Sequence, residues 1–282
     1  MQFQELQSLY VHCCNAVSVI LTQALLNLEK LEIKNCGGLL EVFKLEGLLT
    51  KEREQDVLLI RLKRMLLHDL LELRCIWKGP TQLINLNYLE YLQVFGCKKL
   101  IHLFTPNLAR SLQSLKFLEI EMCDELEHLI DEDEKDQILS SESHLQPLCF
   151  PKLKDIKVKD CNKLKCLFLV TLAHNLLELF TLMIERASQL VEVFAYEDEG
   201  DTVVQKAVRL PRLEFITLDQ LPRLVNFYPR NYHVLLPCLQ KVKVQSCPNM
   251  TRSFAPTPDK TVHVNGEVPT ILAVFIFYFT QL

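Results

Sequence analysis

The sequence predicts an α/β solenoid, in which short repeats stack with a parallel sheet on the concave side and short helices and loops on the convex side. The first observation behind this prediction is the apolar spacing in residues 89–104, LEYLQVFGCKKLIHLF, which places apolar side chains at offsets 0, 3, 5, 8, 11 and 14 from Leu89. This spacing fits neither a helix face nor an alternating strand, and it suits a short strand that turns into an inward-pointing arc. Such a unit buries little by itself, so the spacing predicts that copies stack on it.

The second observation is that the spacing recurs along the chain. Nine units share it, and successive units begin 22 to 38 residues apart. Within each unit, we expect offsets 3 and 5 to point into the core and offsets 2, 4 and 6 to point onto the concave face. Together these features form the leucine-rich-repeat pattern. The units begin at Leu6, Leu28, Leu62, Leu89, Leu115, Leu153, Leu179, Leu213 and Leu239.

The third observation is the distribution of the 11 cysteines. Six stand at offset 8, where a buried turn needs a small residue, so we expect buried, reduced thiols there. The other five show no CxxC spacing of the kind that zinc sites use, so no metal site is predicted. Reduced cysteines favour a cytoplasmic location. So does the N-terminal sequence, which shows no charged leader before the first repeat. The six are Cys14, Cys36, Cys97, Cys123, Cys161 and Cys247.

Length and charge narrow the classes of function. At 282 residues a compact domain would be near its size limit, whereas a solenoid has none because each repeat contacts only its neighbours. The net charge of −4 argues against nucleic acid as a partner. The apolar run 271–279 is too short to span a bilayer, so no transmembrane segment is predicted.

The connections between units predict the structure of the convex side. Apolar residues at helical spacing predict short helices over 20–28, 104–115 and 168–179. Acidic stretches predict solvated loops over 51–56, 131–136 and 196–201. Pro151, Pro211 and Pro237 each stand two residues before a unit's first leucine, where a residue without an N–H donor fits the start of a strand.

The repeat pattern also sets the expected domain boundary. We expect residues 1–256 to form the solenoid and residues 257–282 to form a partly apolar C-terminal cap or tail. Within this tail, 261–264 is expected to form a last edge strand. An interfacial anchor and a non-native or disordered terminus are the alternatives for the apolar run near its end.

A candidate binding surface follows from the outward-pointing offsets. Tyr91, Phe95 and Phe117 are expected on adjacent strands near the middle of the concave face, which is the composition of a protein-binding hot spot. The alternative is that convex or inserted segments fold over these rings. Lysines on the second, sixth and ninth units would meet acidic partners or the chain's own acidic loops. The predicted protein-binding residues are Leu66, Tyr91, Phe95, Phe117, Glu119, Lys157, Lys159, Phe215, Lys241 and Lys243.

Motifs of catalysis and cofactor binding are missing from the sequence. It contains no GxSxG elbow, no HExxH motif and no glycine-rich phosphate loop. Cys166 and His174 are not expected to form a nucleophile pair, since Cys166 falls inside a repeat and His174 in a predicted helix. We therefore predict a protein that is not an enzyme and that has no cofactor, no catalytic residues and no metal ligands.

Three phrases carry a resemblance to a known family: LEKLEIKNCGGLLEVF (28–43), LLHDLLELRCIWKGPTQ (66–82) and FPKLKDIKVKDCNKLKCLF (150–168). They resemble the C-terminal leucine-rich region of plant coiled-coil-type nucleotide-binding leucine-rich-repeat disease-resistance proteins, and the resemblance covers about residues 3–254. It implies a domain that senses pathogen effectors or modified host proteins and that restrains a nucleotide-binding switch. The sequence itself has no Walker-type loop, so the implied partners are a protein ligand and the nucleotide-binding domain of a complete receptor.

Two other functions stay open at this point. One is a leucine-rich-repeat substrate adaptor or scaffold, such as the repeat part of a ubiquitin-ligase receptor, which an F-box before the repeats would indicate. The other is a truncated receptor remnant without independent function. Secretion is disfavoured, because the extracellular plant type resembles LxGxIP repeats rich in glycosylation sites and this sequence has one sequon, at Asn249.

Overall fold

The chain divides into two compact units, residues Met1–Phe150 and Pro151–Leu282, and each is described by itself. The computed structural model has the full chain of 282 residues. The parts whose structure is described are 6–16, 20–21, 27–45, 58–81, 84–131, 149–195, 206–229, 232–250, 252–256, 262–267 and 275–278.

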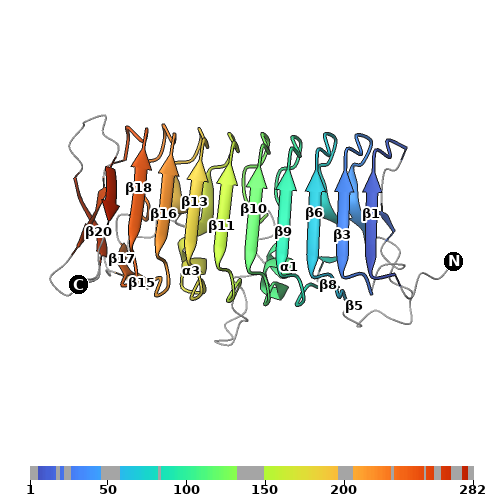
Figure 1. Ribbon diagram of the computed structural model, residues 1–282, viewed down its shortest axis with the longest axis horizontal. Helices are drawn as coiled ribbons and strands as arrows, with labels where there is room; N and C mark the ends of the chain where they lie inside the picture. Colours follow the sequence, from blue (N-terminus) through green and yellow to red (C-terminus); the bar gives the residue numbers. More distant parts are fainter. Residues whose placement is uncertain are drawn as a thin grey trace. The chain divides into compact units, whose positions relative to one another are not determined.

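The main sheet of the first unit confirms the predicted parallel stacking (Figure 1). Neighbouring strands pair in parallel, and the pairing joins equal offsets, as when Met65 lies opposite Leu31 on one side and Leu92 on the other. From the second repeat onward, side chains at offsets 3 and 5 are buried, and those at offsets 2, 4 and 6 lie on the more exposed face. The strands, in order across the sheet, are β1 (Ser8–His12), β3 (Lys30–Lys34), β6 (Arg64–His68), β9 (Tyr91–Phe95) and β10 (Phe117–Glu121).

The opposite side of the first unit is made of short strands and a helix. One sheet holds β2 (Ile20–Leu21), β4 (Glu41–Lys44) and β7 (Cys75–Lys78), and another pairs β5 (Leu58–Leu59) with β8 (Ile84–Asn85). The helix predicted over 104–115 is present as α1 (Pro106–Ser111), which begins with a proline and buries Leu108 against the unit. The helix predicted over 20–28 is wrong where the structure describes it, because Ile20–Leu21 pairs in parallel with β4, and 22–26 lies outside the described residues.

The second unit repeats this arrangement. The strands β11 (Asp155–Lys159), β13 (Thr181–Glu185), β16 (Phe215–Asp219) and β18 (Lys241–Gln245) pair in parallel at equal offsets. β21 (Phe275–Tyr278) adds to β18 in antiparallel orientation, so part of the apolar run near the C-terminus lies in the sheet. The prolines at 151, 211 and 237 lie in the turns that precede β11, β16 and β18, and not at the predicted strand starts.

The second unit also holds two smaller sheets and a short helix. β12 (Cys166–Leu169) pairs with β14 (Glu192–Ala195), and the second sheet has the order β15 (Lys206–Arg209), β17 (Tyr232–Leu236), β20 (Val262–Glu267) and β19 (Arg252–Pro256). The helix α3 (Val170–Ala173) is shorter than the predicted 168–179, because residues 166–169 are extended and pair with β14. The expected edge strand is present as β20, but it is not at an edge, since β17 and β19 flank it. The predicted acidic loops fall outside the described residues except for Asp131.

An aromatic layer at offset 15 lies behind the main sheet of each unit. In the first unit Phe43 stacks on Trp77 with ring centroids 4.4 Å apart and planes 5° from parallel. In the second unit Phe194 stacks on Tyr228, also at 4.4 Å. Large rings at this offset favour extended backbone and bury much apolar area, which explains why Phe168 lies in a strand at the start of a predicted helix. The buried rings are Phe43, Trp77, Phe104, Phe168, Phe194 and Tyr228.

Each parallel strand of the main sheet, in either compact unit, is followed at offset 7 by a residue with left-handed backbone. The non-glycine residues at this offset have φ between 52° and 57°, and Gly96 has φ of 66°. The N–H at offset 7 donates to the carbonyl oxygen at offset 6 of the next repeat. Examples are the bonds from Asp69 to Phe95 at 2.8 Å and from Gly96 to Glu121 at 2.9 Å. This bond couples neighbouring turns. The non-glycine residues are Cys13, Asn35, Asp69, Met122, Asp160, Arg186, Gln220 and Ser246.

The cysteines at offset 8 form a ladder of thiols under these turns. The Cys97 thiol donates to the carbonyl oxygens of Phe95 and Leu67, at 3.6 and 3.8 Å, and so joins two neighbouring repeats. Four of the six predicted buried thiols are buried, while Cys14 and Cys247 are only half-buried. These two belong to the first and the last of the nine repeats. None of the 11 cysteines, all of which lie in the described ranges, forms a disulfide.

We expect the Cys97 thiol to resist alkylation in the folded protein. Burial raises its pKa to about 12 from an ordinary value of 9.0, so the reactive thiolate is scarce at pH 8.5 and the sulfur is covered. Because the folded state keeps a proton that the unfolded chain releases, the free energy of unfolding should fall as the pH rises above about 9. Iodoacetamide treatment followed by peptide mass spectrometry should label exposed Cys13 first. Labelling of Cys97 at the same rate as Cys13 would contradict this assignment.

Candidate functional site

The strands at one end of the first unit carry a connected group of side chains on the exposed sheet face. These side chains come from offsets 2, 4 and 6 of β6, β9 and β10, which lie next to one another in the order given above. We call this group the central cluster. Its residues are Arg64, Leu66, His68, Tyr91, Gln93, Phe95, Phe117, Glu119 and Glu121.

Tyr91 is the residue through which most of the central cluster connects. Its hydroxyl donates to Glu119 Oε2 at 2.9 Å, and the Arg64 guanidinium lies 4.4 Å above its ring centroid. The Phe117 ring lies on its other neighbouring strand with centroids 6.2 Å apart. Burial, together with the hydrogen bond to Glu119, raises the pKa of Tyr91 to about 12. The phenol is therefore a fixed hydrogen-bond donor at physiological pH.

A second chain of hydrogen bonds runs through Gln93. Its amide nitrogen donates to Glu119 Oε2 at 2.8 Å, and its amide oxygen lies 2.9 Å from His68 Nε2. With the amide in this orientation the oxygen must accept, so His68 carries a proton on Nε2. The His68 ring also makes an edge contact with Phe95, with centroids 5.9 Å apart. Rings and polar groups thus hold one another in place across three strands.

The rings of the central cluster remain accessible to different degrees. Phe117 is 38% exposed, which places it among the exposed large apolar residues. Tyr91, Phe95 and Leu66 are half-buried, and each of the three has a cluster neighbour opposite it on the next strand. The structure therefore brings together five of the residues singled out in the sequence, namely Leu66, Tyr91, Phe95, Phe117 and Glu119.

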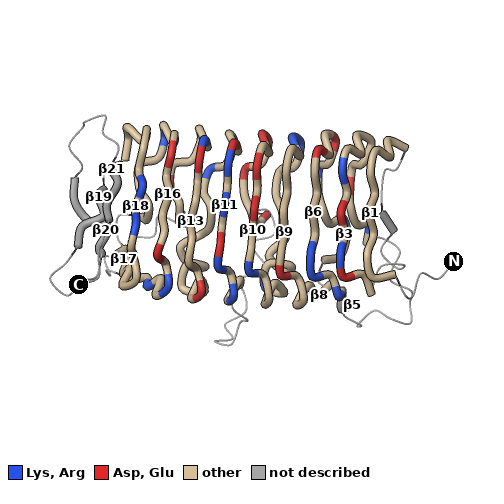
Figure 2. The backbone as a smooth tube through the Cα atoms, in the orientation of Figure 1, with Lys and Arg blue, Asp and Glu red and all other residues tan. Residues whose placement is uncertain are grey.

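The other five predicted residues lie on the exposed sheet face of the second unit. Lys157 and Lys159 are on β11, and Lys241 and Lys243 are on β18 (Figure 2). Lys243 Nζ pairs with Asp219 Oδ2 at 3.0 Å, so this lysine meets a carboxylate of its own sheet. The fifth residue, Phe215, is half-buried.

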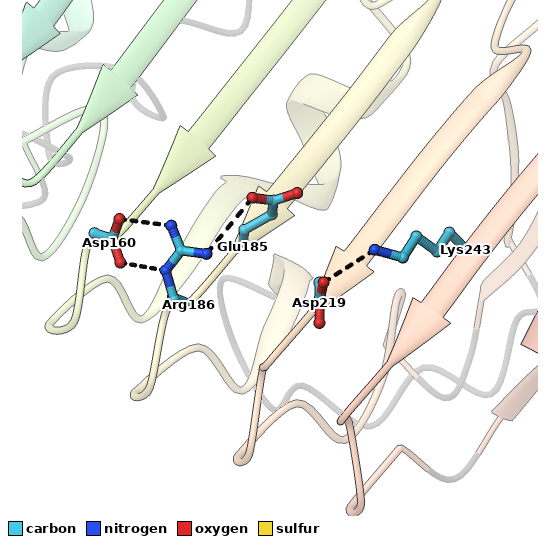
Figure 3. A network of polar contacts seen from close by, with 5 residues as sticks. All are labelled: Asp160, Glu185, Arg186, Asp219 and Lys243. Carbon is cyan, nitrogen blue, oxygen red and sulfur yellow. Dashed lines mark hydrogen bonds and ion pairs between the residues drawn. The ribbon is translucent and has the colours of Figure 1, made fainter. Parts of the chain in front are cut away.

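Sequence reasoning missed two features of this second face. Phe180, which is 37% exposed, meets Phe215 edge to face with centroids 5.2 Å apart. In addition, Arg186 forms a two-pronged pair with Asp160, at 2.5 and 2.8 Å, and lies 3.8 Å from Glu185 (Figure 3). The hydrogen bond from Arg186 lowers the pKa of the Asp160 carboxyl. Both Arg186 and Asp160 stand at offset 7, and the signal that could have found them is opposite charge at one offset of adjacent units.

Within the described ranges, no three His, Cys, Asp or Glu side chains are placed to hold a metal ion. Cys166 is buried within β12, whereas His174 is exposed at the end of α3. Among the residues described here, no helix has the length and apolar character needed to cross a membrane. The surface groups of the central cluster are suited to contact with another molecule through rings, hydrogen bonds and charge.

Parallel strands in equal register, each followed by a left-handed turn and in six of the nine repeats by a cysteine, define a leucine-rich-repeat protein. The profile of the family described as plant disease resistance protein RPS2-like, leucine-rich repeats, matches residues 1–124 and 125–262. The chain belongs to this family. Membership supports a role in protein interaction in plant immunity, and leucine-rich-repeat domains are typically non-enzymatic interaction modules. No solved structure matched the chain significantly.

Proposed function

We propose that this chain is the recognition domain of a plant intracellular immune receptor, and that it binds a pathogen effector or a modified host protein through the central cluster. The observation that carries the proposal is the connected set of rings and polar groups across β6, β9 and β10, with Phe117 exposed among them. Rings that are already held in place lose little entropy on binding, which is a property of hot-spot residues.

The second part of the proposal concerns the output of the receptor. The recognition domain restrains the nucleotide-binding domain of a complete cytoplasmic receptor, and ligand binding changes the contact between them. A ligand shifts such an equilibrium only by its difference in affinity for the two states, so the ligand must bind more tightly to the state in which this contact is released. Family membership supports this part, and co-expression with a nucleotide-binding domain tests it.

The variant Tyr91→Ala/Phe95→Ala/Phe117→Ala is expected to lose protein binding. Removing hot-spot rings costs about 2 kcal/mol or more each, so affinity should fall by at least roughly 30-fold. The partner is first recovered from plant cytosol with the unaltered chain and identified by mass spectrometry. The dissociation constant of the purified partner is then measured by biolayer interferometry against both forms of the chain.

A matched control separates this effect from a general loss of exposed apolar groups. Leu71, Tyr88 and Ile101 are 48%, 44% and 50% exposed and lie outside the strands of the main sheet. The variant Leu71→Ala/Tyr88→Ala/Ile101→Ala should therefore bind the partner as the unaltered chain does. Equal binding by the central-cluster variant would overturn the proposed surface. Recovery of a ubiquitin-ligase subunit as the partner would favour the adaptor function.

A further inference from the structure

Glu119 differs in its partners from several other carboxylates of the first unit. Three carboxylates each pair with a lysine of a neighbouring repeat, namely Glu29, Glu72 and Glu90, with N–O distances of 2.9, 2.6 and 2.9 Å. Glu32 pairs with Lys34 of its own strand at 2.8 Å. These carboxylates thus have their negative charge balanced by a cation close by.

The hydrogen bonds to Glu119 come instead from neutral groups. The Tyr91 hydroxyl and the Gln93 amide both donate to Oε2, and within the described part of the chain no cation lies within 4.0 Å of the carboxylate. Two neutral donors fix the position of the carboxylate without cancelling its charge. Oε1 keeps its capacity to accept a hydrogen bond, and the half-buried position weakens screening by water.

An exposed aromatic ring stands on the same strand as this carboxylate. Phe117 and Glu119 are two residues apart on β10, so both side chains lie on the exposed face of the sheet. The chain also contains an example of the matching chemistry, since the Arg64 guanidinium already lies over the neighbouring Tyr91 ring at 4.4 Å. A flat cation can therefore stack on the exposed side of the Phe117 ring and contact the Glu119 carboxylate at the same time.

We propose that the protein partner bound at the central cluster inserts an arginine side chain between Phe117 and Glu119. This inference rests on the proposed function and adds the chemistry of the group that is recognised. Arginine is favoured over lysine because its planar guanidinium can stack on a ring while one of its N–H groups donates to the open Oε1 of Glu119. Its charge is the complement of the unbalanced charge of Glu119.

The test uses the peptide acetyl-Gly-Arg-Gly-amide and its citrulline counterpart, which has a similar shape but no charge. Binding to the full chain is followed by NMR through the Gln93 side-chain amide and the Phe117 backbone amide. We expect the arginine peptide to bind about tenfold more tightly than the citrulline peptide. The variant Glu119→Gln should remove this preference, and Phe117→Leu should weaken arginine binding by about threefold.

Glu32→Gln is the matched control, because it removes the same charge from the same sheet face at a carboxylate that Lys34 already neutralises. It should leave arginine binding unchanged. Equal binding of the two peptides, or full binding by the Glu119→Gln variant, would overturn the inference. If the peptides do not discriminate but the triple alanine variant still loses its protein partner, only the arginine assignment fails. If the triple alanine variant keeps its partner, the proposed surface itself is wrong.

Discussion

The substitution Phe43→Ala is expected to destabilise the first unit by about 3–5 kcal/mol, because it removes a large buried ring and leaves a cavity. Phe43 is 1% exposed and stacks face to face on Trp77, which is 5% exposed. Trp77 is the one tryptophan in the sequence, so its fluorescence reports directly on this layer. Urea unfolding monitored by that fluorescence should give a lower midpoint for the variant.

The control for this prediction stands three residues earlier in the chain. Leu40 is 41% exposed, and Leu40→Ala should change the free energy of unfolding by no more than about 0.5 kcal/mol. Similar midpoints for the Phe43→Ala and Leu40→Ala variants would show that the aromatic layer does not support the repeat stack.

The second large effect is expected for Gly96→Ala, at about 2–3 kcal/mol of destabilisation. Gly96 occupies the left-handed turn position with φ of 66°, and a Cβ atom added there would lie 2.4 Å from Asp69 Oδ1. An alanine at this position therefore brings backbone strain, and the Asp69 carboxylate must rotate away from the new Cβ atom. The free energy of unfolding is again measured by urea titration with Trp77 as the reporter.

A double-mutant cycle separates these two causes. In an Asp69→Gly background the clashing carboxylate is gone, so Gly96→Ala should cost only about 1–2 kcal/mol of backbone strain. Gly37→Ala serves as a control, since a Cβ atom at Gly37 would meet only Asn15 Oδ1 at an ordinary 3.4 Å. A cost for Gly96→Ala that does not change in the Asp69→Gly background would contradict the predicted clash.

The repeat register could be predicted from the sequence because a parallel stack needs the same offset to face the core in every unit. Offsets 3 and 5 are large aliphatic residues in nearly every unit, and the structure pairs them strand to strand as expected. The face of each side chain then follows from the alternation of a strand. This is why the exposed positions of Tyr91, Phe95 and Phe117 could be placed on adjacent strands from the sequence.

The back of the repeats was predicted less well. The aromatic residues at offset 15 were visible in the sequence, but helical spacing was given more weight between units. Phe168, the first residue of the predicted helix over 168–179, lies instead in the strand β12, where it pairs with Phe194 of β14. The free energy gained by burying such rings outweighs the local preference for helix. This burial depends on contacts between adjacent repeats, so the residues of a single repeat do not reveal it.

The detailed chemistry of the central cluster was also beyond sequence reasoning. The pattern predicted exposed rings, but it did not show that Glu119 accepts from Tyr91 and Gln93 or that Arg64 covers the Tyr91 ring. These contacts join residues 26 to 28 positions apart in the chain, and they depend on side-chain rotamers. Likewise, Phe180 became notable only through its contact with Phe215.

The most direct test of the central claim is site-specific photocrosslinking at the exposed ring. A chain with p-benzoylphenylalanine in place of Phe117 is irradiated in plant cytosol, beside a chain that carries the same group in place of Leu71 outside the sheet face. The proposed recognition surface predicts a discrete crosslinked protein at position 117, lost when Tyr91→Ala and Phe95→Ala are added, and none at position 71. The same crosslinked protein at both positions, or at position 71 alone, would contradict the claim that the central cluster is the binding surface.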